Sequence, residues 1–567
     1  MFDKRILNEV ESAEKEWNKN LIELYEKKLK FNLPERCTES GIPVKPTYTP
    51  KDIEHTSYGD IEMPGSYPYT RGIYPLAYQY QPWMTQQLHG YGLPEHTRER
   101  IDKLISEGMM GYDAPVLLVE IDLASSYGYD PDDSYAKGMV GVTGVSLCKE
   151  EDLEVIFKGF DLSKARVAIS TKITCLPMLA LYLAYAEKRG YSPNQLNGQS
   201  QNRPKFSWLG ENVRGYPPKA QLKLQIELMK YCTQQMPGWN HTNLCGYIPG
   251  ENFATSAQEM GLVLAEAVEL IESGIKAGLE PDDFVPRFSA QFHLGMDFFE
   301  EITKLRAYRR MWAKTMKERF NCKNSRSYQF RFHVHIGGVN LTSQQPLNNI
   351  ARTSLQVLAA VLGGTQSLHT TSYDEAIALP SEEAVTTALR INQIILHESG
   401  VTNISDPLGG SYYIEWLTDK LEGEAWKVVN EIESRGGFVK CMENGWIWQL
   451  FDKQIHKWRQ DVDEGKRIIV GVNKYKQEEK LDIPAFTIEQ EEMEKVATER
   501  IKRWKADRDQ GEVKNALKKV EEAARNYESV DQAGKLMPTL LNAARAKCTV
   551  GEMTGVLFDA YGCVYPY

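Results

Sequence analysis

The sequence predicts an α/β protein built on a (β/α)8 TIM barrel, with an N-terminal helical arm and a mainly helical C-terminal extension. Between about residues 114 and 400, short β-branched or aromatic runs repeatedly precede long segments whose apolar residues recur with a helical period. That alternation is typical of βα units in a parallel sheet, and there are enough units for a barrel. A doubly wound open sheet is the alternative, but no glycine-rich phosphate loop opens the first helix.

The expected units follow one another along the chain, and each helix is too long to be a hairpin connection. The first strand is expected at 116–123, and the later strand and helix pairs are 166–171 with 175–190, 242–248 with 254–278, 284–292 with 295–320, and 328–336 with 348–364. We expect the arm over 1–45, the barrel over 46–409 with a tyrosine-rich segment at 67–92, and the helical region over 410–567.

The composition argues against several classes of function. Asp and Glu number 77 against 67 Lys and Arg, a formal net charge of −10, which argues against nucleic acid as the main partner. No stretch approaches the roughly 18 consecutive apolar residues of a membrane span, and the charged N-terminus lacks the pattern of a secretory signal. The nine cysteines include no CxxC pair, so we expect no metal site, no disulfide framework and a cytoplasmic location.

The expected strands 284–292 and 328–336 alternate strictly between polar and apolar residues, whereas buried parallel strands are normally almost continuously apolar. Because helices cover the outside of such a barrel, the polar faces should point into its bore, which must then hold something polar or wet. The alternative is that these strands are half-exposed or belong to an antiparallel layer. The polar faces consist of Arg287, Ser289, Gln291 and His293 in one strand and of Gln329, Arg331, His333 and His335 in the other.

Motifs along almost the whole chain carry a resemblance to a known family. Residues 70–75 read TRGIYP, residues 367–380 read SLHTTSYDEAIALP, and residues 468–475 read IIVGVNKY. In order and spacing these segments resemble the large chain of the methylmalonyl-CoA mutase family. The resemblance implies a catalytic barrel whose bore admits an acyl-coenzyme A and whose end is capped by adenosylcobalamin, the source of a 5′-deoxyadenosyl radical that starts a carbon-skeleton rearrangement.

The cobalamin-binding module of this family carries a D-x-H-x-x-G motif, and no such motif occurs in the sequence. The chain therefore resembles the large subunits of split mutases, such as isobutyryl-CoA and 2-hydroxyisobutyryl-CoA mutases. The resemblance implies a separate small cobalamin-binding subunit, an acyl-CoA-type substrate and a homodimer of large subunits within a heterotetramer. It also implies a G-protein chaperone, and it gives no reason to expect nucleic acid or a membrane.

Family positions carried over residue by residue give the expected site. In the tyrosine-rich segment, Tyr74 keeps an aromatic residue beside the coenzyme A, Gln81 stands where the family has a phosphate-binding arginine, and Leu88 stands where a tyrosine holds the substrate carboxylate. Glu211, Ile248, Gln291 and His335 also depart from the residues the family has at the reaction centre. The remaining expected contacts are Ser170, Gln201, Arg287 and Ser289 for the substrate and Leu123, Glu251, Glu375 and Ala376 for the cofactor, where the two glutamates hold the ribose.

Glu120 and Glu211 make methylmalonyl-CoA an unfavourable substrate, because carboxylates in a dry reaction centre repel a malonyl or succinyl group unless they are protonated. A substrate with hydroxyl, amide or ammonium donors suits them better. Plain explanations stay open: Glu211 pairs with Arg214 one turn away, Glu120 pairs with a cation in the bore, and Leu88 and Ile248 simply fill a reshaped pocket.

Two other classes of function remain as alternatives. One is a diverged barrel that keeps a partner interface but has no mutase activity. The other is a metal-dependent barrel hydrolase that uses His333, His335 and Asp122, since two histidines separated by one residue on a strand can share a metal. The loss of the family's phosphate-binding and carbonyl-binding side chains also leaves open a substrate without coenzyme A.

Overall fold

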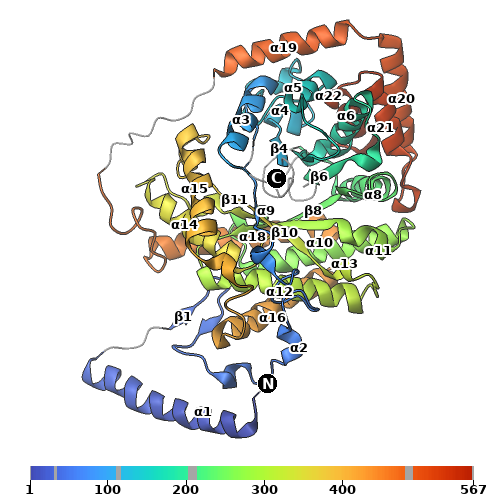
Figure 1. Ribbon diagram of the computed structural model, residues 1–567. Helices are drawn as coiled ribbons and strands as arrows, with labels where there is room; N and C mark the ends of the chain where they lie inside the picture. The colour runs from blue at the N-terminus through green and yellow to red at the C-terminus, as the bar shows by residue number, and fades with distance from the viewer. Residues whose placement is uncertain are drawn as a thin grey trace.

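Parallel strands form the centre of the molecule, and the computed structural model describes residues 2–30, 35–87, 89–109, 116–201, 214–478 and 489–564 (Figure 1). One sheet has the order β3-β11-β10-β9-β8 and the other the order β4-β5-β6-β7, with every pair parallel. The strands are β3 (Met84–Thr85), β4 (Val116–Glu120), β5 (Arg166–Ser170), β6 (Asn197–Gln201), β7 (Trp239–Asn240), β8 (Thr242–Cys245), β9 (Phe288–Leu294), β10 (Arg331–Ile336) and β11 (Ser367–His369).

Two junctions join the sheets into one ring. β7 and β8 are separated only by His241, so they occupy one strand position between β6 and β9. On the other side, the segment that begins with β3 pairs with β11 and then, through a parallel bridge between His89 and Val119, with β4. The predicted (β/α)8 barrel is confirmed.

Helices surround this ring and follow the strands in alternation. They are α3 (Pro94–Ser106), α4 (Leu123–Ser126), α5 (Glu150–Phe157), α6 (Cys175–Lys188), α8 (Pro218–Gln235), α9 (Tyr247–Glu251), α10 (Ser256–Lys276), α11 (Pro281–Phe284), α12 (Phe298–Glu318), α13 (Ser325–Tyr328), α14 (Asn348–Leu362) and α15 (Glu382–Glu398). α10 begins where Thr255 Oγ1 accepts a hydrogen bond from the Gln258 N–H and Gln258 Oε1 accepts one from the Thr255 N–H, a capping box that satisfies two backbone donors.

The apolar faces of the strands form the core between the sheet and the helices. In β9, Ala290, Phe292 and Leu294 are buried in one large cluster that includes Leu305 and Tyr308 of α12. The alternating polar residues lie on the opposite face, as the sequence predicts. Among the described helices, none is long and apolar enough to cross a membrane.

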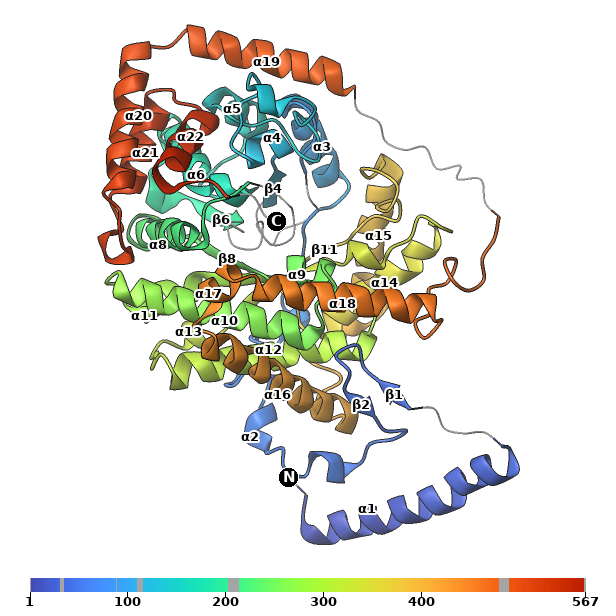
Figure 2. The same cartoon turned by 180° about the vertical axis from the view of Figure 1, so that it is seen from behind.

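The C-terminal helices pack against opposite sides of the barrel (Figure 2). α16 lies along α10 and α12, whereas α21 lies against α6, which explains why α6 is buried almost all round. The helices of this region are α16 (Tyr412–Ser434), α17 (Phe438–Glu443), α18 (Trp446–Asp463), α19 (Gln490–Ala506), α20 (Gln510–Arg525), α21 (Leu536–Arg545) and α22 (Val550–Tyr561).

The N-terminal segment extends away from the barrel (Figures 1 and 2). Its helix α1 (Lys4–Trp17) has no buried residue. Later in the chain, β1 (Arg36–Cys37) and β2 (Pro43–Val44) form a hairpin that is attached to the start of α12. The Glu39 N–H donates a hydrogen bond to Asp297, and the Ser40 N–H donates one to Glu300. A short helix, α2 (Tyr58–Ile61), follows. The division of the chain at residues 45 and 409 stays a prediction.

A buried ion cluster fixes the end of β9 to the helices behind it. Lys304 Nζ on α12 lies 2.8 Å from Glu259 Oε2 and 2.5 Å from Glu301 Oε2, and it donates to the backbone carbonyl of His293 at 2.7 Å. Glu259 Oε1 accepts from the His293 N–H at 2.8 Å. All three charged side chains are at most 4% exposed. The position of His293 is therefore set by charges on two helices.

Candidate active site

A cavity of about 490 Å³ opens at the carboxyl ends of the barrel strands, where enzymes with this fold place their active sites. Three strands contribute to it, β4 through Glu120, β10 through His335 and β11 through His369. The lining consists of Gln87, Gly90, Tyr91, Arg100, Glu120, Thr143, Tyr247, His335, His369, Ser372, Glu375, Ala378, Leu379, Pro380 and Val385.

Three rings form a stack in the wall of this cavity. The His335 ring lies between those of Tyr247 and His369, with centroids 4.1 and 4.2 Å away. Gln291 Nε2 is 2.9 Å from His335 Nδ1. Burial lowers the pKa of His369 to about 4, although a hydrogen bond to the Gln86 carbonyl opposes this shift. His369 is therefore neutral near pH 7, so its ring adds polarity but no positive charge to the wall of the cavity.

One carboxylate, Glu375, lines the same cavity, and a second, Glu251, lies beside the same backbone segment at Gly338. Glu251 Oε2 accepts a hydrogen bond from the Val339 N–H at 3.1 Å, and Glu251 Oε1 lies 3.3 Å from His293 Nε2. Glu375 is crowded by protein but stays open to the cavity, and burial, followed by repulsion from Glu251, raises its pKa to about 7. The pair thus combines a fixed carboxylate with one that titrates near neutrality.

Glu120 and Asp122 have separate environments although they are two residues apart. Glu120 lines the cavity. Asp122 is fully buried and caps α4, accepting hydrogen bonds of 2.7 Å from the Ser125 and Gly141 N–H groups. Asp122 therefore does not join His333 and His335, and the described residues contain no group of three His, Cys, Asp or Glu side chains that could hold a metal ion. His333 Nδ1 lies 2.9 Å from Ser367 Oγ instead.

The opposite mouth of the barrel is cationic. A second cavity of about 200 Å³ at the amino ends of the strands is lined by Arg166, Arg287 and Arg331 together with amide side chains such as Gln199 and Asn240. Burial, followed by Arg331 and Arg326, lowers the pKa of Arg287. These arginines repel one another, so an anion bound among them would relieve that repulsion.

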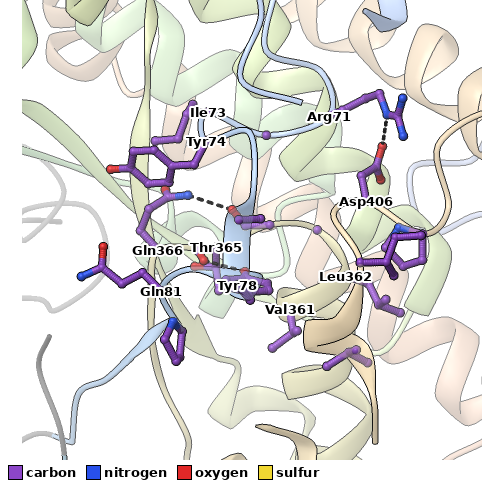
Figure 3. Close-up of a pocket in the computed structure, with 18 of the residues that line it drawn as sticks. Arg71, Ile73, Tyr74, Tyr78, Gln81, Val361, Leu362, Thr365, Gln366 and Asp406 are labelled. Carbon is purple, nitrogen blue, oxygen red and sulfur yellow. Dashed lines mark hydrogen bonds and ion pairs between the residues drawn. The ribbon is translucent and has the colours of Figure 1, made fainter. Parts of the chain in front are cut away.

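The tyrosine-rich segment lies against this end of the barrel. Tyr74 and Gln81 line a further pocket with Gln366 (Figure 3), while Tyr78 donates a hydrogen bond to the Thr365 carbonyl. An ion pair of 2.9 Å between Arg71 and Asp406 joins the segment to the turn that precedes α16. Tyr74 itself remains 45% exposed, which leaves its ring accessible to a ligand.

Other expected site residues do not line the cavity at the carboxyl ends of the strands. Ser170 and Gln201 are register partners at the ends of β5 and β6, and neither Ser170 Oγ nor Gln201 Oε1 has a hydrogen-bond partner within the described ranges. Ser289 Oγ accepts a bond from Asn243. Leu123 begins α4, and Ala376 is exposed beside Glu375.

Ile248 is buried in a cluster with Leu262 and Phe438 and does not line the cavity. Leu88 and Glu211 lie outside the described residues. Arg214, the proposed partner of Glu211, has its guanidinium 3.8 Å from the Tyr129 ring centroid and 4.3 Å from that of Phe558.

Sequence reasoning missed several residues that the fold brings together. Tyr247 and His369 complete the ring stack, and Arg166 joins the cationic mouth from a different strand. His293 belongs to the polar face of its strand but was assigned no contact. The sequence signals were the alternation within the strands and, for His369, its place in the segment 367–380. Neither signal shows which side chains meet, because their neighbours come from other parts of the chain.

The fold and site define a parallel-barrel enzyme with a polar bore, and comparisons with known proteins identify its family. The sequence model described as methylmalonyl-CoA mutase matches residues 37–563. The 2-hydroxyisobutanoyl-CoA mutase large subunit of Aquincola tertiaricarbonis is 35% identical over 566 residues, covering 99% of this chain and 98% of that protein.

Two mitochondrial proteins are similar over most of the chain. The probable methylmalonyl-CoA mutase of Caenorhabditis elegans is 36% identical over 529 residues, covering 93% of this chain and 69% of its own. The human mitochondrial methylmalonyl-CoA mutase is 34% identical over 565 residues, covering 99% of this chain and 73% of the human protein. The chain belongs to the methylmalonyl-CoA mutase family, whose named relatives are CoA mutases and hence isomerases of the intramolecular transferase type.

Proposed function

We propose that this chain is the large subunit of an adenosylcobalamin-dependent acyl-CoA mutase that rearranges the carbon skeleton of a hydroxylated or otherwise neutral acyl-CoA. The observation that carries this proposal is the polarity of the bore from end to end. Arginines surround one mouth, and carboxylates with a histidine stack surround the other. A thioester with anionic phosphates at one end and a polar acyl group at the other matches both ends.

The cationic mouth supports recognition of the coenzyme A phosphates. Gln81 cannot supply the charge of the arginine that the family has at its position, but Arg166, Arg287 and Arg331 supply positive charge close to the barrel axis. Ser170 and Gln201 offer further polar atoms to a chain that runs along the bore. Tyr74 supplies an exposed aromatic face next to that mouth.

The acyl end argues against a carboxylated substrate. Glu120 and Glu375 place carboxyl groups in the wall of the cavity, and Glu251 lies beside Glu375. Arg100 is held by a hydrogen bond to the Pro380 carbonyl and lies 5.4 Å from the Tyr91 ring centroid. A malonyl group would add negative charge among these carboxylates, which repel it unless they are protonated. A hydroxyl group can instead donate a hydrogen bond to Glu120.

The residues present are also suited to the adenosyl part of the cofactor. Two neighbouring carboxylates, Glu251 and Glu375, accept hydrogen bonds from a vicinal diol such as that of ribose. When bound, adenosylcobalamin supplies the radical that removes a hydrogen atom from the substrate. The protein's part is to orient the two ligands, and the packed rings of Tyr247, His335 and His369 exclude water between them.

The proposed assembly has a separate partner. The Aquincola relative is named as a large subunit and aligns over 98% of its length, which supports pairing of this chain with a small cobalamin-binding subunit. A homodimer of large subunits within a heterotetramer, a G-protein chaperone and a cytoplasmic location complete the proposal by analogy with split mutases.

Replacing Arg287 with methionine tests the proposed path of coenzyme A. We expect the affinity for free coenzyme A to fall by about tenfold or more, since a charge-assisted hydrogen bond to phosphate contributes about 1.5–3 kcal/mol. Affinity for pantetheine, which lacks the phosphates, should hardly change. Isothermal titration of both ligands gives the comparison, with Arg319→Met on the outer surface as the matched control. Equal losses for the two ligands, or no loss for either, would contradict this path.

A further inference from the structure

The side chain of His293 lies in a narrow space that the backbone leaves open for it. Its ring occupies a slot between two glycines: a Cβ atom on Gly250 would come within 2.3 Å of the His293 side chain, and one on Gly337 would come within 2.0 Å of Nε2. Such approaches are impossible for any residue with a side chain. The backbone of two separate segments is thus adapted to hold an imidazole at this place.

The slot directs the imidazole at Glu251. His293 Nε2 and Glu251 Oε1 lie 3.3 Å apart, and both atoms are buried. The geometry is that of an ion pair rather than a well-aligned hydrogen bond. Glu251 Oε2 accepts a hydrogen bond from the Val339 N–H. Each carboxylate oxygen of Glu251 is therefore held by a different protein group.

Glu375 lies next to this fixed carboxylate but is not held in the same way. A Cβ atom on Gly338 would lie 3.6 Å from Glu251 Oε2 and 3.7 Å from Glu375 Cγ, which puts both side chains beside the same backbone segment. Glu375 faces the cavity. The two carboxylates are therefore neighbours, and the Glu251 side chain keeps 25% of its surface exposed.

We propose that His293 is a positioning residue that holds Glu251 as a fixed acceptor for a vicinal diol and leaves Glu375 as the group that exchanges a proton when the diol binds. This inference rests on the proposed function, because the expected diol is that of the adenosyl ribose. Two ionised carboxylates accept hydrogen bonds from two hydroxyl groups better than a protonated pair does.

The charges around the two carboxylates agree with the different roles proposed for Glu251 and Glu375. His293 is surrounded by Glu251, Glu259 and Glu301 and by the cation Lys304, and the interaction with Glu251 raises its pKa despite burial. Glu375 is surrounded by Glu251 and Asp374, and its pKa is raised to about 7. A rise of pH through this value ionises Glu375, so diol binding should strengthen as the pH rises and should release a proton below it.

The test is calorimetric titration of the full-length chain with 5′-deoxyadenosine between about pH 6 and about pH 8, in buffers of different ionisation enthalpy. The wild type should bind more tightly with rising pH and release a proton. 2′,3′-Dideoxyadenosine, which lacks the diol, should bind more weakly and without this pH dependence. In His293→Asn, Glu251 loses the imidazole that holds its Oε1, so the affinity for 5′-deoxyadenosine should fall by about tenfold, whereas the affinity for the dideoxynucleoside should hardly change.

Two further variants complete the test. His456→Asn, on the exposed surface of α18, should match the wild type. Glu375→Gln keeps His293 but should abolish proton release, and it decides the question if His293→Asn does not fold. An unchanged affinity for 5′-deoxyadenosine in His293→Asn, or proton release that persists in Glu375→Gln, would overturn this role while leaving the diol site intact. If the wild type bound the two nucleosides equally, both this role and the proposed ribose site would be wrong.

Discussion

Lys304→Met is expected to lower the free energy of unfolding by about 3–5 kcal/mol, because it leaves buried carboxylates without their cation. Lys304 is 1% exposed and contacts both Glu259 and Glu301. The methionine side chain is similar in length, so the loss comes from charge and hydrogen bonding rather than from an empty cavity. The Lys304 bond to the His293 carbonyl is lost at the same time.

The loss should depend on pH in a defined direction. Burial already raises the pKa of Glu301 to about 7, and removal of Lys304 raises it further. A carboxyl group with a raised pKa in the folded state favours folding below its unfolded pKa, and this contribution disappears as the pH rises through the folded value. The variant should therefore differ most from the wild type above about pH 7.

Chemical denaturation at several pH values measures this effect. Lys314→Met provides the control, because Lys314 lies on the same helix, is 32% exposed and makes longer ion pairs of 3.6 and 3.8 Å. That control should lose at most about 1 kcal/mol. Similar losses in the two variants would show that the buried cluster does not stabilise the barrel as described.

Glu120→Gln should reduce kcat/KM for a hydroxyacyl-CoA by about 10–100-fold in the assembled mutase, the value of a charge-assisted hydrogen bond of about 1.5–3 kcal/mol. The substitution keeps the size of the side chain and removes only its charge. Turnover of a carboxylated thioester should fall less, or rise, because the variant no longer repels it.

Steady-state kinetics with a hydroxylated and a carboxylated acyl-CoA measure this ratio. Glu99→Gln, exposed on α3, is the control and should leave both values unchanged. If Glu120→Gln lowered kcat/KM for both thioesters by the same factor, Glu120 would not discriminate between substrates.

The barrel could be predicted because its signals are local. Alternation in 284–292 and 328–336 gave both the strands and the polar face that forms the bore, since the two faces of a strand follow directly from its sequence. The helical periodicity of 254–278 and 295–320 likewise placed α10 and α12, although α10 begins and α12 ends within a few residues of the expected limits.

The contacts of the site could not be predicted in the same way. His293 meets Glu251 only because Gly250 and Gly337 leave room for its ring, and no pattern in the sequence joins these positions. Lys304 lies in a helix whose sequence appears amphipathic and charged, yet the side chain is buried by α10 and β9. Which charges are buried depends on how the helices pack.

The most direct test of the central claim is the absorbance of cob(II)alamin in the reconstituted complex of this chain, a small cobalamin-binding subunit and adenosylcobalamin. A mutase selective for neutral substrates should accumulate the cob(II)alamin signal and form rearranged product when a hydroxyacyl-CoA is added, with little response to methylmalonyl-CoA. A larger response to methylmalonyl-CoA would contradict the proposed selectivity. A complex that binds the cofactor but gives neither signal nor product with any acyl-CoA would show a non-catalytic subunit instead.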